Sequence, residues 1–460
     1  MASVAPTAKA SAAGARSGNV DALIDEPRLS GLQVRIFVIC AFVLLCEGYD
    51  LQALALAVPE IADEFGIAAA RFSVALSASL AGMAIGGALF APFGDRHGRK
   101  PMLIIAMLLT GASTIATLAF AHGWWIATCR LFTGIGLGIT TVNAAAMISD
   151  YSPAKWRFLL MTLLTSTVPG GAFLAAMIAP TLIAADGWRA IFILGAVVPF
   201  AGAAVTWLWA PESLKWLVAT RPGDSRIGAI LAQHAPDLDS ARLFITRPDE
   251  TSERGSIMGL LSPQHRVRTL VVWLSAISGA FSLYLMVSWL PTLLRQAHWS
   301  TADALTGTAA PQLGGIGGSL LMAWAIDRRK LLVALVTGYG CATAALLGIG
   351  LLPGSVLGWK VMLLLAGAGT SGMQSIWMAV AVGLYPLELR ATSAGWVAAV
   401  SRIGAVTAPL AGGIALSAHI APQHVLLALV APIGASTIAI VLARRHFVPP
   451  LPVIEPGETT

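Results

Sequence analysis

The sequence predicts an all-α membrane protein with twelve transmembrane helices in two pseudo-symmetric halves of six helices each. Three observations support this fold class. Hydrophobic residues make up 57% of the 460-residue chain and charged residues only 11%, against about 25% in an ordinary soluble domain. Apolar runs of the ~20 residues needed to cross a bilayer recur along the chain. Several landmark residues of the first half also recur in the second half at a nearly constant offset.

The apolar runs place twelve spans in order along the chain. They are expected at 33–58, 72–93, 101–121, 124–148, 158–184, 189–210, 269–294, 306–326, 331–352, 359–384, 391–416 and 422–443. After the sixth span comes a polar stretch without an apolar period, which is expected to link the halves. The predicted organisation is a disordered N-terminal tail at 1–32, a first half at 33–210, a linker at 211–268, a second half at 269–445 and a C-terminal tail at 446–460.

Basic residues indicate the orientation in the membrane. Lys and Arg are concentrated in the linker and in the loops of one side, whereas the loops of the other side contain only Arg71, Arg189, Arg295 and Lys360. Because Lys and Arg are enriched in cytoplasmic loops, both termini and the linker are expected to be cytoplasmic. We recognise no secretory signal, so we expect a multi-pass protein of the inner (plasma) membrane, surrounded by the lipid bilayer.

The two halves repeat one another. Four pairs of like residues lie 232 to 234 positions apart: Pro59 and Pro291, Asp95 and Asp327, Tyr151 and Tyr385, and Arg157 and Arg390. The two prolines are expected to close the first helix of each half. Tandem six-helix repeats are a recognised transporter architecture, with the substrate site near the midplane between the halves. The repeat therefore narrows the class from membrane protein to carrier.

The loop after the second span carries the most specific local motif. It reads Gly94-Asp95-Arg96-His97-Gly98-Arg99-Lys100-Pro101. The glycines permit a tight turn, and Asp95 can cap the next helix or pair with a basic group. The residues expected to act in gating are Gly94, Asp95, Arg96, Gly98 and Arg99, their counterparts Asp327 and Arg328, and Asp150 and Arg390 at helix ends on the same side.

This loop resembles the hallmark loop of the major facilitator superfamily, with Ala91 in the place of its usual first glycine. Further motifs resemble one branch, the aromatic acid:proton symporters, which includes 4-hydroxybenzoate carriers. They are Glu47-Gly48-Tyr49-Asp50, Arg130 with Gly134, Gly136, Gly138 and Asn143, Asp150-Tyr151-Ser152-Pro153, Gly187-Trp188-Arg189, Pro211-Glu212-Ser213, Ser288-Trp289-Leu290-Pro291, Gln312-Leu313-Gly314-Gly315, Tyr385-Pro386, Arg390-Ala391-Thr392, Gly395-Trp396 and Arg402. The resemblance covers residues 33–445. It implies the major facilitator fold, a monomer, and proton-driven import of a small aromatic carboxylate.

Glu47 and Asp50 are the predicted proton-coupling residues. They are three positions apart and therefore share one face of the first span. A charged group inside a span costs at least ~2.5 kcal/mol, so it normally faces a cavity or a partner. Two buried carboxyl groups close together can hold and release a proton near neutral pH, as coupling requires. The alternative is a structural salt bridge to Arg130 or Arg402.

Arg130 and Arg402 are the predicted partners of an anionic substrate. Arg130 lies early in the fourth span and Arg402 midway along the eleventh. An arginine fork matches a carboxylate bidentately. The alternative is an internal ion pair with Glu47, Asp50 or Asp150, and the sequence does not choose between the two arginines.

Aromatic and amide side chains within the spans complete the predicted substrate-binding set. Tyr284 and Trp377 can stack on an aromatic ring, although Trp is also common at membrane interfaces. Gln312, Gln374 and Asn143 can hydrogen-bond a ring hydroxyl.

Other chemistries are not indicated. No Gly-x-x-x-x-Gly-Lys-Ser/Thr sequence is present, so ATP is not the expected energy source. The glycines at 134, 136 and 138 lie inside a span, where close helix packing explains them better than nucleotide binding. The histidines share no spacing and the four cysteines lie in apolar runs, so we expect no metal, cofactor or disulfide. We also expect no nucleic-acid partner and no enzymatic activity.

Three functional hypotheses follow. The first is proton symport of a hydroxybenzoate-like carboxylate. The second is the same fold with another cargo, such as an aliphatic acid, a sugar, or a drug in antiport. It is kept because Glu47 and Asp150 each exchange one acidic residue for the other relative to the branch. The third is a membrane sensor without net flux, which the absence of a long cytoplasmic signalling domain disfavours.

Overall fold

The computed structural model describes residues 29–120, 122–234, 256–328, 330–351 and 355–447, together with Val20 and Ile24, and all regular secondary structure within them is helical. The first half consists of α2 (Gly31–Phe65), α3 (Ser73–Ile85), α5 (Arg99–Ala116), α6 (Gly123–Tyr151), α7 (Ala154–Asp186) and α8 (Arg189–Trp209). The second half consists of α12 (Arg266–Gln296), α14 (Ala309–Asp327), α15 (Leu331–Leu351), α16 (Val356–Leu384), α17 (Leu387–Ser417), and α18 (Pro422–Ala428) followed by α19 (Val430–Leu442).

Twelve long helical segments cross the bundle, as the sequence predicts. Ten of the described segments are long and apolar enough to cross a membrane by length and composition alone. The remaining two are α5 and α14, with 18 and 19 residues. At 1.5 Å rise per residue, each of these still reaches about 27 Å, close to the thickness of the hydrocarbon core. Turns of other types extend the second span, because α3 is preceded by a 3-10 turn at Ala69–Phe72 and followed by a π-helical turn at Gly86–Phe90.

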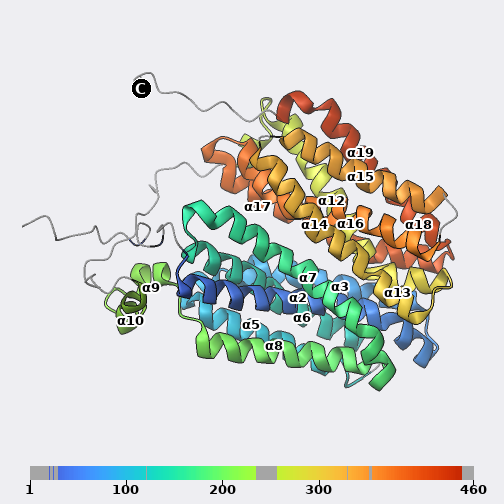
Figure 1. Ribbon diagram of the computed structural model, residues 1–460, viewed down its shortest axis with the longest axis horizontal. Helices are drawn as coiled ribbons and strands as arrows, with labels where there is room; N and C mark the ends of the chain where they lie inside the picture. Colours follow the sequence, from blue (N-terminus) through green and yellow to red (C-terminus); the bar gives the residue numbers. More distant parts are fainter. Residues whose placement is uncertain are drawn as a thin grey trace, which may run out of the picture.

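The two halves lie side by side, with α2, α3 and α7 of the first half facing α12, α17 and α14 of the second (Figure 1). We call the end of the bundle that carries α9 and α10 the linker end, and the opposite end, which carries α13 (Thr301–Gly307), the far end. Side-chain bonds join the halves across this seam. Ser77 donates to the Val406 carbonyl at 2.9 Å, and the hydroxyls of Ser166 and Ser319 lie 3.2 Å apart.

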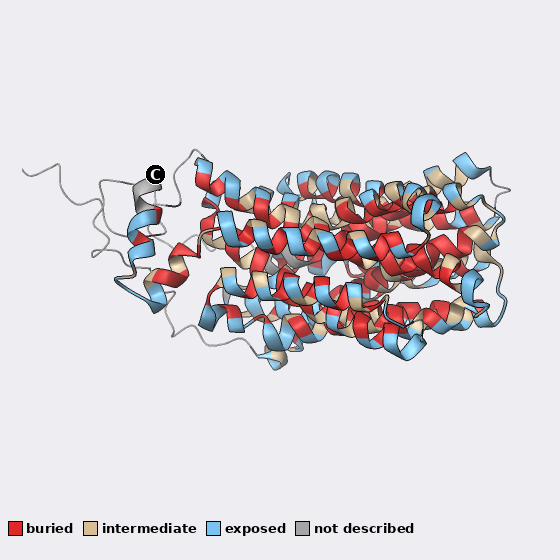
Figure 2. Cartoon of the chain, turned by 90° about the horizontal axis from the view of Figure 1, so that it is seen from below, coloured by how far each residue is buried: buried red, intermediate tan, exposed pale blue. Residues whose placement is uncertain are grey.

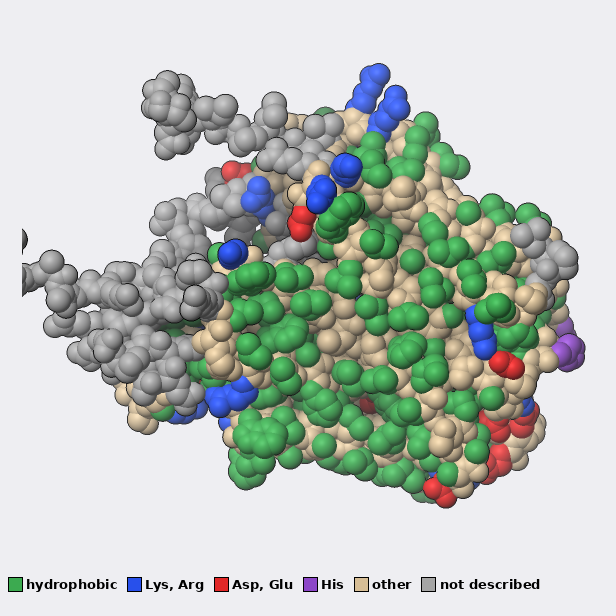
Figure 3. All heavy atoms as spheres, viewed as in Figure 1, with side chains coloured by type: hydrophobic (Ala, Val, Ile, Leu, Met, Phe, Trp, Pro, Cys, Tyr) green, Lys and Arg blue, Asp and Glu red, His purple; other side chains and the backbone are tan. Residues whose placement is uncertain are grey.

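The surface is that of a protein surrounded by lipid. In the face shown in Figure 3, hydrophobic side chains cover the side of the bundle, and most of the charged side chains lie near its two ends. Exposed and buried residues alternate along the outer helices, with the buried ones turned inward (Figure 2). Large apolar side chains such as Trp207, Leu321 and Leu442 are more than half exposed. A water-facing protein rarely exposes so much contiguous apolar surface.

The expectation that Pro59 and Pro291 close their helices is wrong. Both prolines lie inside helices, which continue to Phe65 in α2 and to Gln296 in α12. A proline removes one backbone donor, and a membrane helix tolerates this loss when neighbouring groups bond the freed carbonyl. The helix α2 instead ends at Gly66, whose left-handed conformation (φ 62°) is a common helix stop.

The described part of the linker contains short helices, although the sequence shows no apolar period there. It contains the short helices α9 (Leu214–Thr220), α10 (Ser225–His234) and α11 (Ile257–Leu260). The Ser213 hydroxyl caps α9 by accepting from the Trp216 N–H, and one face of α10 is buried through Ile227 and Ile230. Two apolar residues three positions apart thus give α10 a buried face within a polar segment. Residues 235–255 and nearly all of both predicted tails lie outside the described ranges.

Candidate functional site

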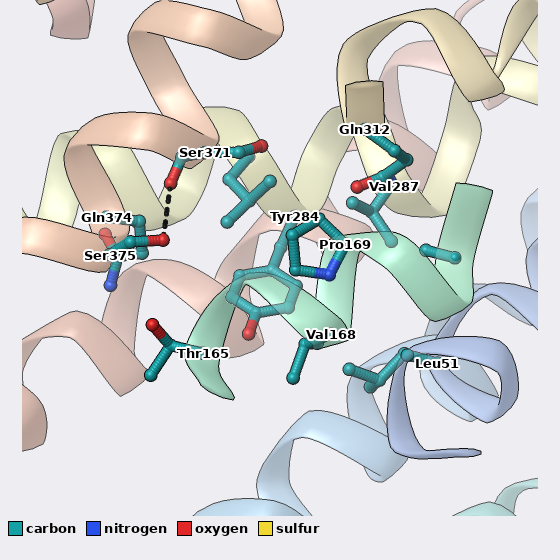
Figure 4. Close-up of a pocket in the computed structure, with 13 residues that line it drawn as sticks. Leu51, Thr165, Val168, Pro169, Tyr284, Val287, Gln312, Ser371, Gln374 and Ser375 are labelled. Atoms are coloured by element: carbon teal, nitrogen blue, oxygen red, sulfur yellow. Dashed lines mark hydrogen bonds between the residues drawn. The ribbon is translucent and has the colours of Figure 1, made fainter. Parts of the chain in front are cut away.

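A pocket lies at the seam between the two halves, near the middle of the bundle. It encloses about 630 Å³ of space free of atoms, including open solvent at its mouth. Its walls come from α2 and α7 of the first half and from α12, α14 and α16 of the second. Tyr284, Gln312 and Gln374, three of the predicted binding residues, line it (Figure 4).

The two sides of this pocket differ in chemistry. The second half contributes a polar wall on α14 and α16, which carries Gln312, Gln374 and two serines. The first half contributes a mainly apolar wall, of which Val168 and Pro169 on α7 are part. Tyr284 on α12 lies between them in Figure 4. Such a pocket suits a flat molecule with an apolar ring and a few hydrogen-bonding substituents.

Two smaller cavities adjoin the pocket. One, of about 320 Å³, is lined by Asp50 and Arg130 and shares Leu51, Tyr284 and Val287 with the pocket. The other, of about 240 Å³, contains Gln52 and likewise shares a wall with the pocket. The pocket thus shares wall residues with the cavity that holds a buried acidic and basic pair.

Asp50 and Arg130 form a buried ion pair. Arg130 Nη1 lies 3.2 Å from Asp50 Oδ1, and the two side chains are 1% and 0% exposed. The Thr114 hydroxyl donates to the same carboxylate at 3.1 Å, and the guanidinium lies 5.2 Å from the centre of the Phe192 ring. Of the alternatives open for Asp50 and Arg130, this structure shows the internal pair.

Glu47 and Arg402 lie near each other but do not form an ion pair within 4 Å in the described part of the chain. The Glu47 carboxylate is buried and accepts a 2.7 Å hydrogen bond from Thr141 on α6. The Arg402 guanidinium is close enough to Glu47 and Tyr284 to interact with both electrostatically. A second acidic and basic system thus lies near the pocket, more loosely joined than the first.

Trp377 and Asn143 do not line the pocket, contrary to their expected role. The Trp377 indole N–H donates to the Tyr339 hydroxyl at 2.9 Å in the core of the second half. Asn143 donates to the carbonyls of Ile139 and Ala91, at the linker end of α6. Trp377 and Asn143 lie on membrane helices, as predicted. The rotation of each helix, which hydropathy does not reveal, places their side chains outside the lining of the pocket.

The loop at the linker end forms one connected cluster. Arg99 Nη2 lies 2.6 Å from Asp95 Oδ1 and its Nε lies 3.9 Å from Asp150 Oδ2. Asp95 therefore pairs with Arg99 and does not cap α5. The cap is Glu212, whose Oε1 accepts from the backbone N–H groups of Arg99 and Lys100 at 2.9 and 3.2 Å. A carboxylate at a helix N-terminus is favourable because unpaired N–H groups point there.

The other predicted gating residues also lie at the linker end. Gly94 is buried against Asn143, and Arg96 lies over the Phe93 ring. Arg328 lies over the Trp324 ring, next to Asp327 at the end of α14. Arg390 donates to the Tyr385 carbonyl at 3.1 Å. Arg96, Arg328 and Arg390, together with Asp327, thus lie at helix ends. Their role in gating stays a prediction.

Several polar residues near the site were missed by sequence reasoning. Thr114 and Thr141 bond the two buried carboxylates, and Gln52 contacts Gln312. At the far end Arg295 joins Glu60 and Asp63 at 3.1 and 3.2 Å. A threonine within a span is common and does not by itself indicate a site. Gln52 could have been found from the sequence, because it lies two residues after the Glu47–Asp50 motif.

The comparisons with known proteins agree with this architecture. A family model described as the Major Facilitator Superfamily matches residues 40–409. The chain is 30% identical to a gallate transporter of Pseudomonas putida over 92% of this chain and 94% of that protein. It is 29% identical to the 4-hydroxybenzoate transporter PcaK of the same species, over 93% and 96% of the two chains. The crystal structure of a D-xylose-proton symporter superposes with a TM-score of 0.66 at 16% identity, covering 91% and 98%.

Proposed function

The chain belongs to the Major Facilitator Superfamily, and from this we propose that it imports a small, hydroxybenzoate-like aromatic carboxylate together with a proton by alternating access. It is a membrane transporter and not an enzyme. The observation that carries the proposal is the buried Asp50–Arg130 ion pair, which lines a cavity that adjoins the pocket at the seam.

Charge balance at this ion pair couples the proton to the substrate. A proton on Asp50 removes the negative partner of Arg130 and leaves a buried positive charge, which is costly. A substrate carboxylate bound beside Arg130 restores the balance. Binding of the proton and of the anion then favour each other, as linkage requires. Arg402 and Glu47 add a second site of the same kind beside Tyr284.

The pocket at the seam would bind the aromatic ring and the ring hydroxyls of the substrate. An aromatic ring fits between Tyr284 and the apolar wall of α7, where it can stack and be desolvated. Ring hydroxyls reach Gln312 and Gln374 on the polar wall. Two relatives of the chain are named as carriers of hydroxylated aromatic acids, gallate and 4-hydroxybenzoate, which supports the same class of cargo here.

The orientation and assembly belong to the same proposal. The linker end, both termini and the gating cluster around Arg99 face the cytoplasm of a cell whose inner membrane holds the protein as a monomer. The excess of Lys and Arg at that end supports this orientation. The far end then faces outward, and the two halves rock about the pocket between them.

The test is uptake of labelled 4-hydroxybenzoate into cells that express the protein, with and without a protonophore. We expect uptake that the protonophore abolishes and that hydroxylated benzoates compete, whereas aliphatic acids do not. Competition by aliphatic acids or sugars would move the assignment to another cargo. Efflux that raises drug tolerance would indicate antiport, and ligand binding without accumulation would indicate a sensor.

A further inference from the structure

Gln52 joins the pocket to the backbone of the opposite half. It is 0% exposed in the middle of α2, two residues after Asp50. Its Nε2 donates to the Val287 carbonyl on α12 at 3.3 Å, and its Oε1 accepts from Gln312 Nε2 on α14 at 3.4 Å. Both partners belong to the second half, and both line the pocket.

The Val287 carbonyl is available because of Pro291. In a regular helix the N–H of residue 291 would donate to the carbonyl of residue 287, four positions earlier. Pro291 has no N–H, so this carbonyl has lost its intrahelical donor. A buried carbonyl without a partner is costly, and the Gln52 amide supplies the missing donor from across the seam.

Ion pairs join the same two helices at the far end of the molecule. Glu60 and Asp63 on α2 lie two to three turns beyond Gln52, and both pair with Arg295 on α12. The Gln52–Val287 bond is therefore the innermost link in a contact between α2 and α12 that runs from the pocket toward the far end. Gln312, at the other side of Gln52, faces the substrate space.

We propose that Gln52 is a positioning residue that couples occupancy of the pocket to closure of the far end, through the Val287 carbonyl that Pro291 leaves free. This inference rests on the proposed transport function. A substrate that bonds Gln312 changes the partner of the Gln52 amide and thereby the strength of the α2–α12 contact. Gln52 acts through Gln312 and Val287, so its loss should alter the rate of the conformational cycle more than substrate affinity.

The first variant is Gln52→Met, which keeps the length of the side chain and removes both bonds. In proteoliposomes we expect the maximal uptake rate to change at least about fivefold, the equivalent of one hydrogen bond, while the equilibrium dissociation constant of labelled 4-hydroxybenzoate stays within about twofold. The contrasting variant is Gln374→Met. It also removes an amide of the pocket wall but has no bond to α2, so it should weaken binding instead.

The second variant, Pro291→Ala, tests the mechanism without touching the pocket. It restores the N–H at position 291, so the Val287 carbonyl regains a partner within α12 and no longer needs Gln52. We expect it to reproduce the rate change of Gln52→Met. The double variant should then add little to either single change, because both act on one bond.

Closure of the far end is measured separately, by the rate at which an introduced cysteine is labelled. Ser77→Cys places a cysteine at the seam beside Val406, in a protein whose four native cysteines are replaced. In the absence of substrate, Gln52→Met should speed the labelling of this cysteine by a membrane-impermeant reagent. It should also reduce the change in labelling rate that substrate causes. The inference would be overturned if Gln52→Met kept the wild-type uptake rate and labelling rate, or if it lowered only the affinity for substrate. A wild-type protein that neither binds nor carries the aromatic acids would instead overturn the proposed function, while substrate-free labelling still tests the Gln52 bond.

Discussion

The two buried carboxylates differ in how tightly the protein holds them. Asp50 has a guanidinium at 3.2 Å and a threonine hydroxyl at 3.1 Å, whereas Glu47 has, among the described residues, the Thr141 hydroxyl alone within bonding distance. Breaking a buried ion pair by removing one charge typically costs about 3–5 kcal/mol. Asp50 is therefore the group whose protonation changes the balance of the site most.

Asp50→Asn should lower protonophore-sensitive uptake at least about tenfold, because the neutral amide cannot take up and release the proton that accompanies the substrate anion. Exchange of labelled for unlabelled substrate, which needs no net proton movement, should be less impaired. The matched control is Asp186→Asn, an exposed carboxylate at the end of α7. Normal accumulation by Asp50→Asn would remove this residue from the coupling step.

At the scale of the element, the start of α5 depends on a residue from a distant part of the chain. Glu212 caps α5 from the segment after α8, and the Tyr151 hydroxyl donates to the Glu212 carbonyl at 2.6 Å. Gly98 precedes the helix with φ 106°, and a Cβ at that position would clash with the Glu212 carboxylate. The glycine is needed both for its backbone angle and for the space beside the cap.

Gly98→Ala should therefore destabilise the protein by about 1–3 kcal/mol, through backbone strain and displacement of the Glu212 cap. The expected result is a lower Tm of the purified protein in detergent. Gly340→Ala in α15 is the control, because an added Cβ there meets no atom within 4 Å. Equal Tm values for the two variants would show that Gly98 and the Glu212 cap beside it do not contribute this stability.

The whole molecule closes its far end with opposite charges at equivalent positions of the two repeats. Asp63 and Arg295 are 232 residues apart, the same offset that separates the repeated prolines, and they meet across the seam at 3.2 Å. Glu60 pairs with the same arginine at 3.1 Å. Partly exposed pairs of this kind contribute little to stability, but we expect them to bias which end of a two-state carrier is closed.

Arg295→Gln should shift the protein toward states open at the far end, since both ion pairs are lost together. We expect faster labelling of a far-end cysteine and a changed ratio of influx to efflux rates. Exchanging the charges in Asp63→Arg with Arg295→Asp should restore part of the closure. Arg71→Gln, which removes an exposed far-end arginine, is the control. The effect of Arg295→Gln should shrink in high salt, which screens the pairs.

Composition and spacing along the chain were enough to predict the lipid environment, the number and order of the spans, the repeat, and the location of Glu47, Asp50, Arg130 and Arg402 within membrane helices. These properties are local, so they can be read from the chain directly. Three outcomes depended on helix packing: Arg130 pairs with Asp50, Glu212 and not Asp95 caps α5, and Trp377 and Asn143 do not line the pocket. These outcomes depend on the rotation of each helix and on contacts between residues far apart in the chain. Packing of all twelve helices settles them together.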